Sequence, residues 1–329
     1  MPKTRYFPEF KQGLPDVTGK VFVITGTTSG TGFVAARTVA ELGGEAVLLN
    51  RSSDRVDRML LSLKEAAPDG KFVTIECDLQ NFGSVRKAAD EIKSRYEAIY
   101  CLANNAGIMA TPDEATVDGY DTQMQTNHLS HFLLTAELLP LLEVAAETNA
   151  DARIVNHSSF GRLHTPNNRL EEKYFGKNGG NLGGNDIGLM KGGCFYRYFQ
   201  TKLANSVFTH GLAEKLQASN TKVRAICAHP GSSDTNLLDQ MELGFFMKFM
   251  TRVLAPFMMQ TAEDGAMGLI TGMLSADAQS GVLYGPKNNG TKGKAVPVPA
   301  QPFETDRRDI DMLWRTSEEA TQTRLLPLD

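Results

Sequence analysis

Two residues four positions apart, Tyr198 and Lys202, could carry acid–base chemistry. They lie in the stretch 196–217, which has the pattern of a helix, and this spacing places both side chains on one helix face. A lysine cation beside a phenol favours the phenolate, so it lowers the pKa of the tyrosine. Tyr196 has Gln200 four positions later, which makes Tyr198 the better candidate. An ordinary surface pair has the same spacing, so the pattern alone leaves both interpretations open.

A glycine-rich turn near the N-terminus could hold a phosphate group. It lies between a predicted strand, 20–25, and a predicted helix, 31–42, and it reads Thr25-Gly26-Thr27-Thr28-Ser29-Gly30-Thr31-Gly32. Glycines let backbone N–H groups approach a pyrophosphate, and the helix N-terminus adds a partial positive charge. This context predicts a dinucleotide site, although a tight strand-to-helix connection also accounts for the glycines.

The end of the second predicted strand, 45–50, bears on the choice of dinucleotide. A site that prefers NAD usually has a carboxylate here, which binds the ribose hydroxyls. This sequence has Asn50-Arg51 instead, and no acid occurs before Asp54. Arg51 can pair with a 2′-phosphate through charge-assisted hydrogen bonds. We therefore predict NADP(H) over NAD(H), with a solvated loop arginine as the alternative.

Short β-branched runs alternate with longer helical patterns through the first two thirds of the chain. The predicted strands are 20–25, 45–50, 71–77, 98–105, 153–159 and 222–228, and the predicted helices are 31–42, 54–67, 83–95, 118–146 and 196–217. Strands this short and apolar are typical of a parallel sheet that is covered on both faces. We predict an α/β fold, a Rossmann-type doubly wound parallel sheet, in a single domain over 1–329 with a helical substrate lid.

Three segments lie outside this alternation. Residues 160–195 separate a strand from a helix and hold eight glycines between Gly176 and Gly193, which favours a mobile surface loop. Residues 236–260 are crowded with leucine, phenylalanine and methionine, which favours either helices packed on the core or the lid. The predicted core covers about 19–285, and a polar C-terminal extension, 286–329, holds one helical piece around 309–321.

The overall composition limits the class of protein. A chain of 329 residues, 41% apolar and 22% charged, can form an ordinary globular core. Its 34 basic and 38 acidic residues give no support for nucleic-acid binding. The four cysteines lack metal-ligand spacing, so we expect free thiols, a reducing compartment and no metal site. Because no apolar run has the length of a signal peptide or a transmembrane segment, we predict a cytoplasmic protein.

Together these motifs resemble the short-chain dehydrogenase/reductase family. The matching segments occur in the family's order and at about its distances: TGTTSGTG (25–32), CDL (77–79), NNAG (104–107), TNHLSHF (126–132), VNHSS (155–159), Tyr198-x3-Lys202 and HPGSSDTNL (229–237). From Asn127 onward the sequence is most similar to the retinol dehydrogenase-like branch, which includes WW-domain oxidoreductases. Two features depart from the simplest pattern: Ser29 stands where NADP-preferring members often have a basic residue, and 38 residues separate Ser159 from Tyr198.

The resemblance implies a role for each residue of the site. Tyr198 would exchange a proton with the substrate oxygen, and Lys202 would lower its pKa and hold the nicotinamide ribose. Ser159 would polarise the substrate oxygen, and Asn127 would hold a water on a proton path. The implied cofactor-binding residues are Gly26, Thr28, Ser29, Gly30, Thr31, Gly32, Arg51, Asp78, Leu79, Asn105, Ala106, Gly107, Tyr198, Lys202, Pro230, Gly231 and Thr235.

The implied activity is hydride transfer between NADP(H) and the carbonyl or alcohol of a small hydrophobic substrate. Two alternatives stay open, a non-catalytic regulator that senses the dinucleotide and a light-dependent tetrapyrrole reductase. The second would need several cysteines near the substrate, and only Cys194 and Cys227 are suitably located. In related proteins the helices that correspond to 118–146 and 196–217 pair across a two-fold axis, so we also predict a homodimer.

Overall fold

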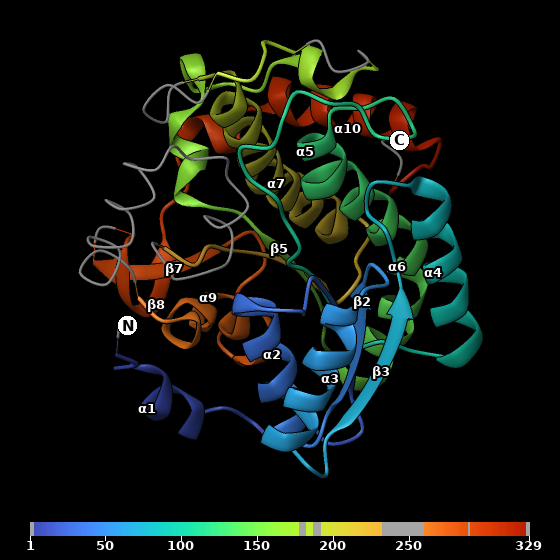
Figure 1. Cartoon of the computed structure of the whole chain (residues 1–329), viewed down its shortest axis with the longest axis vertical. Coiled ribbons are helices and arrows are strands. Elements are labelled where there is room, and N and C mark those ends of the chain that lie inside the picture. The colour runs from blue at the N-terminus through green and yellow to red at the C-terminus, as the bar shows by residue number, and fades with distance from the viewer. Residues whose placement is uncertain (1–2, 178–181, 187–191, 232–259, 289, 327–329) are drawn as a thin grey trace.

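The computed structural model describes residues 3–177, 182–186, 192–231, 260–288 and 290–326 (Figure 1). Its centre is one eight-stranded sheet in the order β3-β2-β1-β4-β5-β6-β7-β8. The strands are β1 (Val21–Thr25), β2 (Glu45–Asn50), β3 (Lys71–Glu76), β4 (Cys101–Asn104), β5 (Ala152–His157), β6 (Val223–Ala228), β7 (Leu283–Asn288) and β8 (Lys292–Val298). Strands β1 to β7 pair in parallel, and the order runs outward from β1 in both directions. The sheet is therefore doubly wound, which confirms the predicted fold class.

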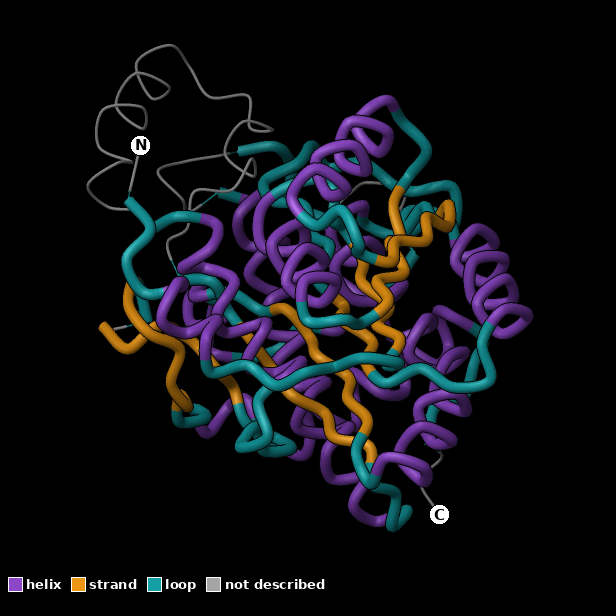
Figure 2. The backbone as a smooth tube through the Cα atoms, turned by 90° about the horizontal axis from the view of Figure 1, so that it is seen from below, coloured by secondary structure: helices purple, strands orange, loops and turns teal. Residues whose placement is uncertain are grey.

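Helices cover both faces of the sheet, and each face has its own hydrophobic core (Figures 1 and 2). On one side lie α1 (Phe7–Gln12), α2 (Gly30–Glu41), α3 (Asp54–Ala66) and α9 (Ala262–Leu274). On the other lie α4 (Phe82–Arg95), α6 (Ser130–Asn149), α7 (Gly193–Ala218) and α10 (Arg307–Thr321). Strand residues alternate between the two cores: Phe22 and Ile24 pack on the α2 side and Val23 on the α6 side. The central strands are therefore mostly apolar, since both of their faces are covered, whereas β3 and β8 at the two edges have exposed positions.

The predicted helix over 118–146 is interrupted in the structure. A short α5 (Thr122–Met124) leads into one π-helical turn, Gln125–Leu129, and only then into α6. The π-turn contains Asn127. A π-turn adds a residue to the helix and occurs often at functional sites, but the hydrophobic pattern does not reveal it.

The end of the sheet corrects the predicted boundary of the core at about 285. Strand β8 pairs antiparallel with β7, so the sheet extends to Val298 and is not entirely parallel. Several side chains of β8 are partly or fully exposed, and Pro297 lies within it. An edge strand of this kind needs neither a continuous apolar run nor a complete set of N–H donors, which is why its pattern was not recognised. Helices α1 and α9 were not predicted either.

The glycine-rich segment has an anchored part. The prediction of a mobile surface loop covered 176–193, of which 178–181 and 187–191 lie outside the described residues. Leu182 is 8% exposed and packs into the core on the α6 side. The Asp113 carboxylate accepts hydrogen bonds from the N–H groups of Leu182 (2.9 Å) and Gly184 (2.8 Å). The described residues of this segment are therefore held against the loop after β4, which glycine content alone did not predict.

Helix α10, from the C-terminal extension, packs on α6 and α7. The Trp314 ring lies 5.6 Å from the ring of Phe132 and 5.5 Å from that of Phe208, centroid to centroid. Helix α10 thus covers part of α6 and α7, the two helices of the predicted homodimer contact, while Val144 of α6 stays 44% exposed. The homodimer remains a prediction.

The stretch Thr122–Asn149 is long and apolar enough, by length and composition, to cross a membrane. However, 67% of its most apolar window is buried inside the fold. Core helices commonly have this property, so the stretch is weak evidence for a membrane span. The predicted lid, 236–260, lies outside the described residues except for Gln260.

Candidate active site

The glycine-rich turn has the backbone conformation that its sequence predicts. Gly26 and Gly30 have φ angles of +70° and +63°, in the left-handed region that favours glycine. A Cβ on Gly32 would lie 2.3 Å from the Gly26 carbonyl oxygen, so this glycine allows α2 to pack against the turn. The side chain of Ser29 makes no capping hydrogen bond to α2. The N–H groups of the first turn of α2 can therefore donate hydrogen bonds to an anionic ligand.

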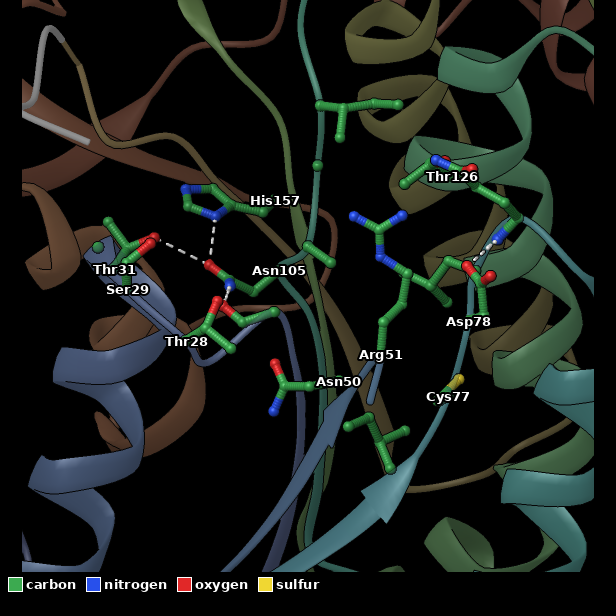
Figure 3. A pocket seen from close by; sticks show the side chains of 18 of the residues that line it. Thr28, Ser29, Thr31, Asn50, Arg51, Cys77, Asp78, Asn105, Thr126 and His157 are labelled. Carbon is green, nitrogen blue, oxygen red and sulfur yellow. Dashed lines mark hydrogen bonds between the residues drawn. The ribbon is translucent and has the colours of Figure 1, made fainter. Parts of the chain in front are cut away.

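Asn105 forms the floor of the pocket, and Figure 3 shows its bonds to Thr31 and His157. Its amide nitrogen donates to the carbonyls of Thr25 (2.9 Å) and Gly26 (3.1 Å). Its amide oxygen accepts from Thr31 Oγ1 (2.9 Å) and bonds His157 Nδ1 (2.8 Å). Burial lowers the pKa of His157 to about 3, so the ring is neutral. Asn105 thus joins the glycine turn to β5, and both ends of its amide are used.

The far end of the pocket lacks a carboxylate at the end of β2. Asn50 is buried, and its amide bonds Thr27 twice, from the Thr27 N–H (2.9 Å) and to Thr27 Oγ1 (2.7 Å). Arg51 and Arg55 are exposed and line the pocket. Arg55 was missed at the sequence level, although it stands four positions after Arg51 at the start of α3. The two guanidinium groups bring two positive charges to this end of the pocket, where Asp78 beside Arg51 adds one carboxylate (Figure 3).

Ser159, Tyr198 and Lys202 lie together at the other end of the same pocket. Tyr198 and Lys202 come from α7, and both are 5% exposed. The Lys202 ammonium lies 5.7 Å from the centre of the Tyr198 ring and donates to the His157 carbonyl (3.0 Å). Ser159 Oγ accepts from the Gly161 N–H (3.1 Å), which leaves its own proton for another acceptor.

Burial determines the ionisation of this group. It raises the pKa of Tyr198 to about 12, and the hydrogen bond with Ser159 acts in the opposite direction but is the smaller effect. It lowers the pKa of Lys202 to about 8. The sequence predicted a lowered tyrosine pKa, and the structure corrects this because the cost of burying a phenolate dominates. At neutral pH Tyr198 therefore keeps its proton.

Asn127 lies beside Lys202, held by the π-turn. Its amide oxygen accepts from the Ile108 N–H (2.8 Å), and its amide nitrogen donates to the Ile108 carbonyl and to Thr201 Oγ1 (both 2.9 Å). A Cβ on Gly107 would lie 3.2 Å from Lys202 Nζ and 3.3 Å from Asn127 Oδ1. The glycine thus leaves space between the lysine and the asparagine.

Most of the predicted cofactor-binding residues line one pocket: Gly26, Thr28, Ser29, Gly30, Thr31, Arg51, Asp78, Leu79, Asn105, Ala106, Gly107, Tyr198, Lys202 and Pro230. Gly32 and Gly231 do not line it. Gly231 has a φ angle of +65°, and a Cβ added to it would lie 2.3 Å from the Thr291 carbonyl oxygen. Thr235 lies outside the described residues. Within the described ranges, no cluster of His, Cys, Asp and Glu could hold a metal ion.

Comparison with known proteins identifies the family. A family model for short chain dehydrogenase matches residues 20–168. An uncharacterized oxidoreductase of Schizosaccharomyces pombe is 33% identical over 258 residues, which cover 77% of this chain and 72% of that protein. This chain is a short-chain dehydrogenase/reductase. The resemblance inferred from the motifs is confirmed, and the chain belongs to a family of oxidoreductases.

Two further relatives extend the comparison. Human retinol dehydrogenase 12 is 31% identical, over 75% of this chain and 71% of that protein. The crystal structure of an uncharacterized protein from Mycobacterium paratuberculosis is 30% identical and superposes with a TM-score of 0.72. The superposition covers 97% of this short-chain dehydrogenase/reductase and 98% of the mycobacterial chain. The similarity therefore includes the C-terminal extension as well as the dinucleotide fold.

Proposed function

We propose that this short-chain dehydrogenase/reductase transfers a hydride between NADP(H) and the carbonyl or alcohol group of a hydrophobic substrate, with Tyr198 as the acid/base. The observation that carries the proposal is the arrangement of a single pocket. A protonated tyrosine, a serine hydroxyl and a buried lysine meet at one end, and a glycine turn and two arginines lie at the other. The bound nicotinamide would supply or accept the hydride.

The protein's own residues handle the proton. In the reducing direction the Tyr198 phenol would donate its proton to the substrate oxygen, and the Ser159 O–H would donate a hydrogen bond to the same oxygen. The tyrosinate that results is stabilised by the nearby Lys202 ammonium. The tyrosinate must then regain a proton from solvent, on a path through Lys202 and a water that the neighbouring Asn127 would hold. Loss of Tyr198 should therefore be the most damaging change.

The residues present fit a dinucleotide with a 2′-phosphate. The uncapped N-terminus of α2 suits the pyrophosphate, and Lys202 suits the nicotinamide ribose. Arg51 and Arg55 together can bind a 2′-phosphate, whereas the neutral Asn50 side chain is engaged by Thr27. This distribution of charge supports NADP(H) over NAD(H).

Aromatic side chains around Tyr198 support a hydrophobic substrate. Tyr198 belongs to a cluster with Phe195 and Phe199, against which Met109 packs. Next to Ser159, Phe160 is 39% exposed and contacts His164, which in turn contacts Phe199. Beside Ser159 and Tyr198 the chain thus has one exposed aromatic side chain, Phe160, and under it a buried aromatic cluster that one methionine contacts. Such surroundings favour a bulky apolar carbonyl, because each buried methylene contributes about 0.8 kcal/mol.

We expect apolar ketones and aldehydes to be reduced with higher kcat/KM than sugars or other short polar carbonyls. Phe160→Ala should raise KM several-fold for bulky substrates and less for small ones, because it removes apolar contact area. Leu61→Ala removes an exposed apolar side chain of α3, away from the pocket, and serves as the control. Steady-state kinetics on a graded carbonyl series measures both. Equal efficiency on sugars and on aromatic carbonyls would refute the hydrophobic substrate.

The pH dependence should differ between the two directions of reaction. Lys202 has a pKa of about 8 instead of its ordinary value near 10.5, so it loses its charge as the pH rises through 8. The value of kcat/KM for reduction should therefore be constant up to about pH 7. Above pH 8 it should decline, because the tyrosinate then has no lysine cation beside it. Alcohol oxidation needs the Tyr198 phenolate, whose pKa is raised to about 12, so it should increase toward alkaline pH. Profiles of kcat/KM in both directions test this, and a reduction profile that stays level to pH 10 would contradict it.

One experiment separates this activity from the two alternatives. NADPH oxidation is followed with a carbonyl panel in darkness and in light, alongside the absorbance spectrum of the purified protein. Turnover in the dark supports the proposal, turnover only in light supports a tetrapyrrole reductase, and binding without turnover supports a regulator. Cys194 and Cys227 are 2% and 0% exposed, so neither thiol favours the light-driven alternative.

Location and assembly remain proposals of the same kind. The four cysteines are free and buried, which supports a reducing compartment and the predicted cytoplasmic location. The predicted homodimer would have to use surface that α10 leaves open on α6 and α7. The proposed function itself requires neither.

A further inference from the structure

A carboxylate from the C-terminal extension is buried beneath the catalytic group. Glu304 ends the 3₁₀ turn η6 (Pro302–Glu304), and its side chain is entirely buried. Its Oε1 accepts hydrogen bonds from Arg162 Nε (2.7 Å) and from Ser206 Oγ (2.6 Å). Its Oε2 accepts from the Gln301 N–H (2.7 Å), which fixes the carboxylate within its own turn. The proposed function assigns no role to this group.

The two donors to Oε1 belong to the two elements that position Ser159 and Tyr198. Arg162 lies in the 3₁₀ turn η2 (Phe160–His164), whose N-cap is Ser159, and its NH1 also donates to the Ser159 carbonyl (3.3 Å). Ser206 lies in α7, one turn beyond Lys202. A single carboxylate oxygen therefore connects the serine-bearing turn to the helix of the tyrosine and lysine.

The contact between η2 and α7 is close. A Cβ on Gly161 would lie 2.8 Å from Phe199 Cδ1 and 3.3 Å from Tyr198 Cε1. The Gly161 N–H is also the donor that fixes Ser159 Oγ. How η2 lies on α7 thus determines where the serine hydroxyl stands relative to the Tyr198 phenol.

We propose that Glu304 is a positioning residue for catalysis. Its carboxylate holds η2 on α7, so that Ser159 and Tyr198 address the same substrate oxygen. It acts through Arg162 and Ser206 and does not touch the reacting atoms. The inference rests on the proposed function of Ser159 and Tyr198.

Glu304→Gln tests this because it keeps the side-chain length and removes the charge. A misplacement of about 1 Å between catalytic groups can cost roughly 10²-fold in rate, so kcat for NADPH-dependent carbonyl reduction should fall roughly 10- to 100-fold. The Kd for NADPH, measured by fluorescence in the absence of substrate, should be unchanged. A loss confined to kcat is not what a general loss of packing would produce.

Asp309→Asn is the matched control. Asp309 is another buried carboxylate of the C-terminal extension, and it binds the Leu170 N–H (2.9 Å) and Arg169 (3.5 Å). Its hydrogen bonds reach neither η2 nor α7. We expect Asp309→Asn to lower Tm, as Glu304→Gln does, but to keep the wild-type kcat. An equal fall of kcat in both variants would overturn the positioning role.

A double-mutant cycle decides whether Glu304 acts through the serine. If it does, Glu304→Gln lowers kcat little further in a Ser159→Ala background. Losses that multiply independently would overturn the inference. Should Glu304→Gln fail to fold, Ser206→Ala removes only one donor to the carboxylate, and it should show a smaller loss of kcat with the same unchanged Kd.

The outcomes separate the inference from the proposed function. Wild-type kcat in both Glu304→Gln and Ser206→Ala, with Tyr198→Phe inactive, would overturn the inference and leave the proposed function standing. A wild-type protein that reduced no carbonyl would overturn both.

Discussion

Tyr198→Phe should lower kcat for carbonyl reduction by at least ~10²-fold, because it removes the proposed proton donor and keeps the ring. The phenol is 5% exposed and, with a pKa raised to about 12, protonated at neutral pH. No solvent proton can easily replace it in so buried a position. The aromatic packing on Phe199 is retained, so the Kd for NADPH and the Tm should change little. Stopped-flow or steady-state NADPH oxidation, with a fluorescence titration of the cofactor, measures both quantities.

Tyr196→Phe is the matched control for this change. Tyr196 lies two positions earlier in α7, is partly exposed, and packs against the same aromatic cluster. It does not line the pocket, and no lysine follows it after four positions. We expect nearly wild-type turnover from Tyr196→Phe. If Tyr196→Phe were the more damaging of the two, the proton donor would have been assigned to the wrong tyrosine.

The sequence predicted strands β1 to β6, including β3 at one edge of the sheet, but not β7 and β8 at the other end. The segments for β1 and β2 are short apolar runs, because burial on both faces leaves no other composition. Strand β8 has one neighbour in the sheet, a proline and several exposed side chains, so it resembles a loop in sequence. A partly exposed strand can still be predicted, as β3 was, but β8 combines its exposed positions with two lysines and a proline.

The sequence predicted most of the residues that line the pocket, but not the ionisation of Tyr198. Tyr198 and Lys202 follow from a spacing of four on a helix, and the structure brings both to the pocket. The predicted direction of the tyrosine pKa was wrong, since it considered the lysine charge and not the burial of the phenol. Burial is a tertiary property that no local pattern contains. The same reason explains why Glu304, more than a hundred residues from Tyr198, was not found.

Arg51→Asp should erode or reverse the preference for NADPH over NADH. One charge-assisted interaction between a phosphate and an arginine is worth roughly 1.5–3 kcal/mol, so its loss should shift the ratio of kcat/KM values about 10- to 100-fold. An aspartate at this position also adds repulsion toward the 2′-phosphate and a new acceptor for ribose hydroxyls. Kinetics with both cofactors at fixed carbonyl substrate gives the ratio.

The size of the Arg51 effect depends on its neighbour in the pocket. Arg55 also lines this end, so Arg51→Asp alone should leave part of the phosphate binding, and Arg55→Gln should shift the same ratio by a smaller factor. Arg58→Asp is the control, because it makes the same change of charge on an exposed residue of α3 outside the pocket. A shift with Arg58→Asp as large as that with Arg51→Asp would mean that net charge, and not a phosphate contact, sets the preference. The Asn50 amide is hydrogen-bonded to Thr27, and no carboxylate stands at this position to bind the ribose hydroxyls of NADH. We therefore expect poor activity with NADH. Wild-type protein that used NADH as well as NADPH would refute the predicted cofactor preference.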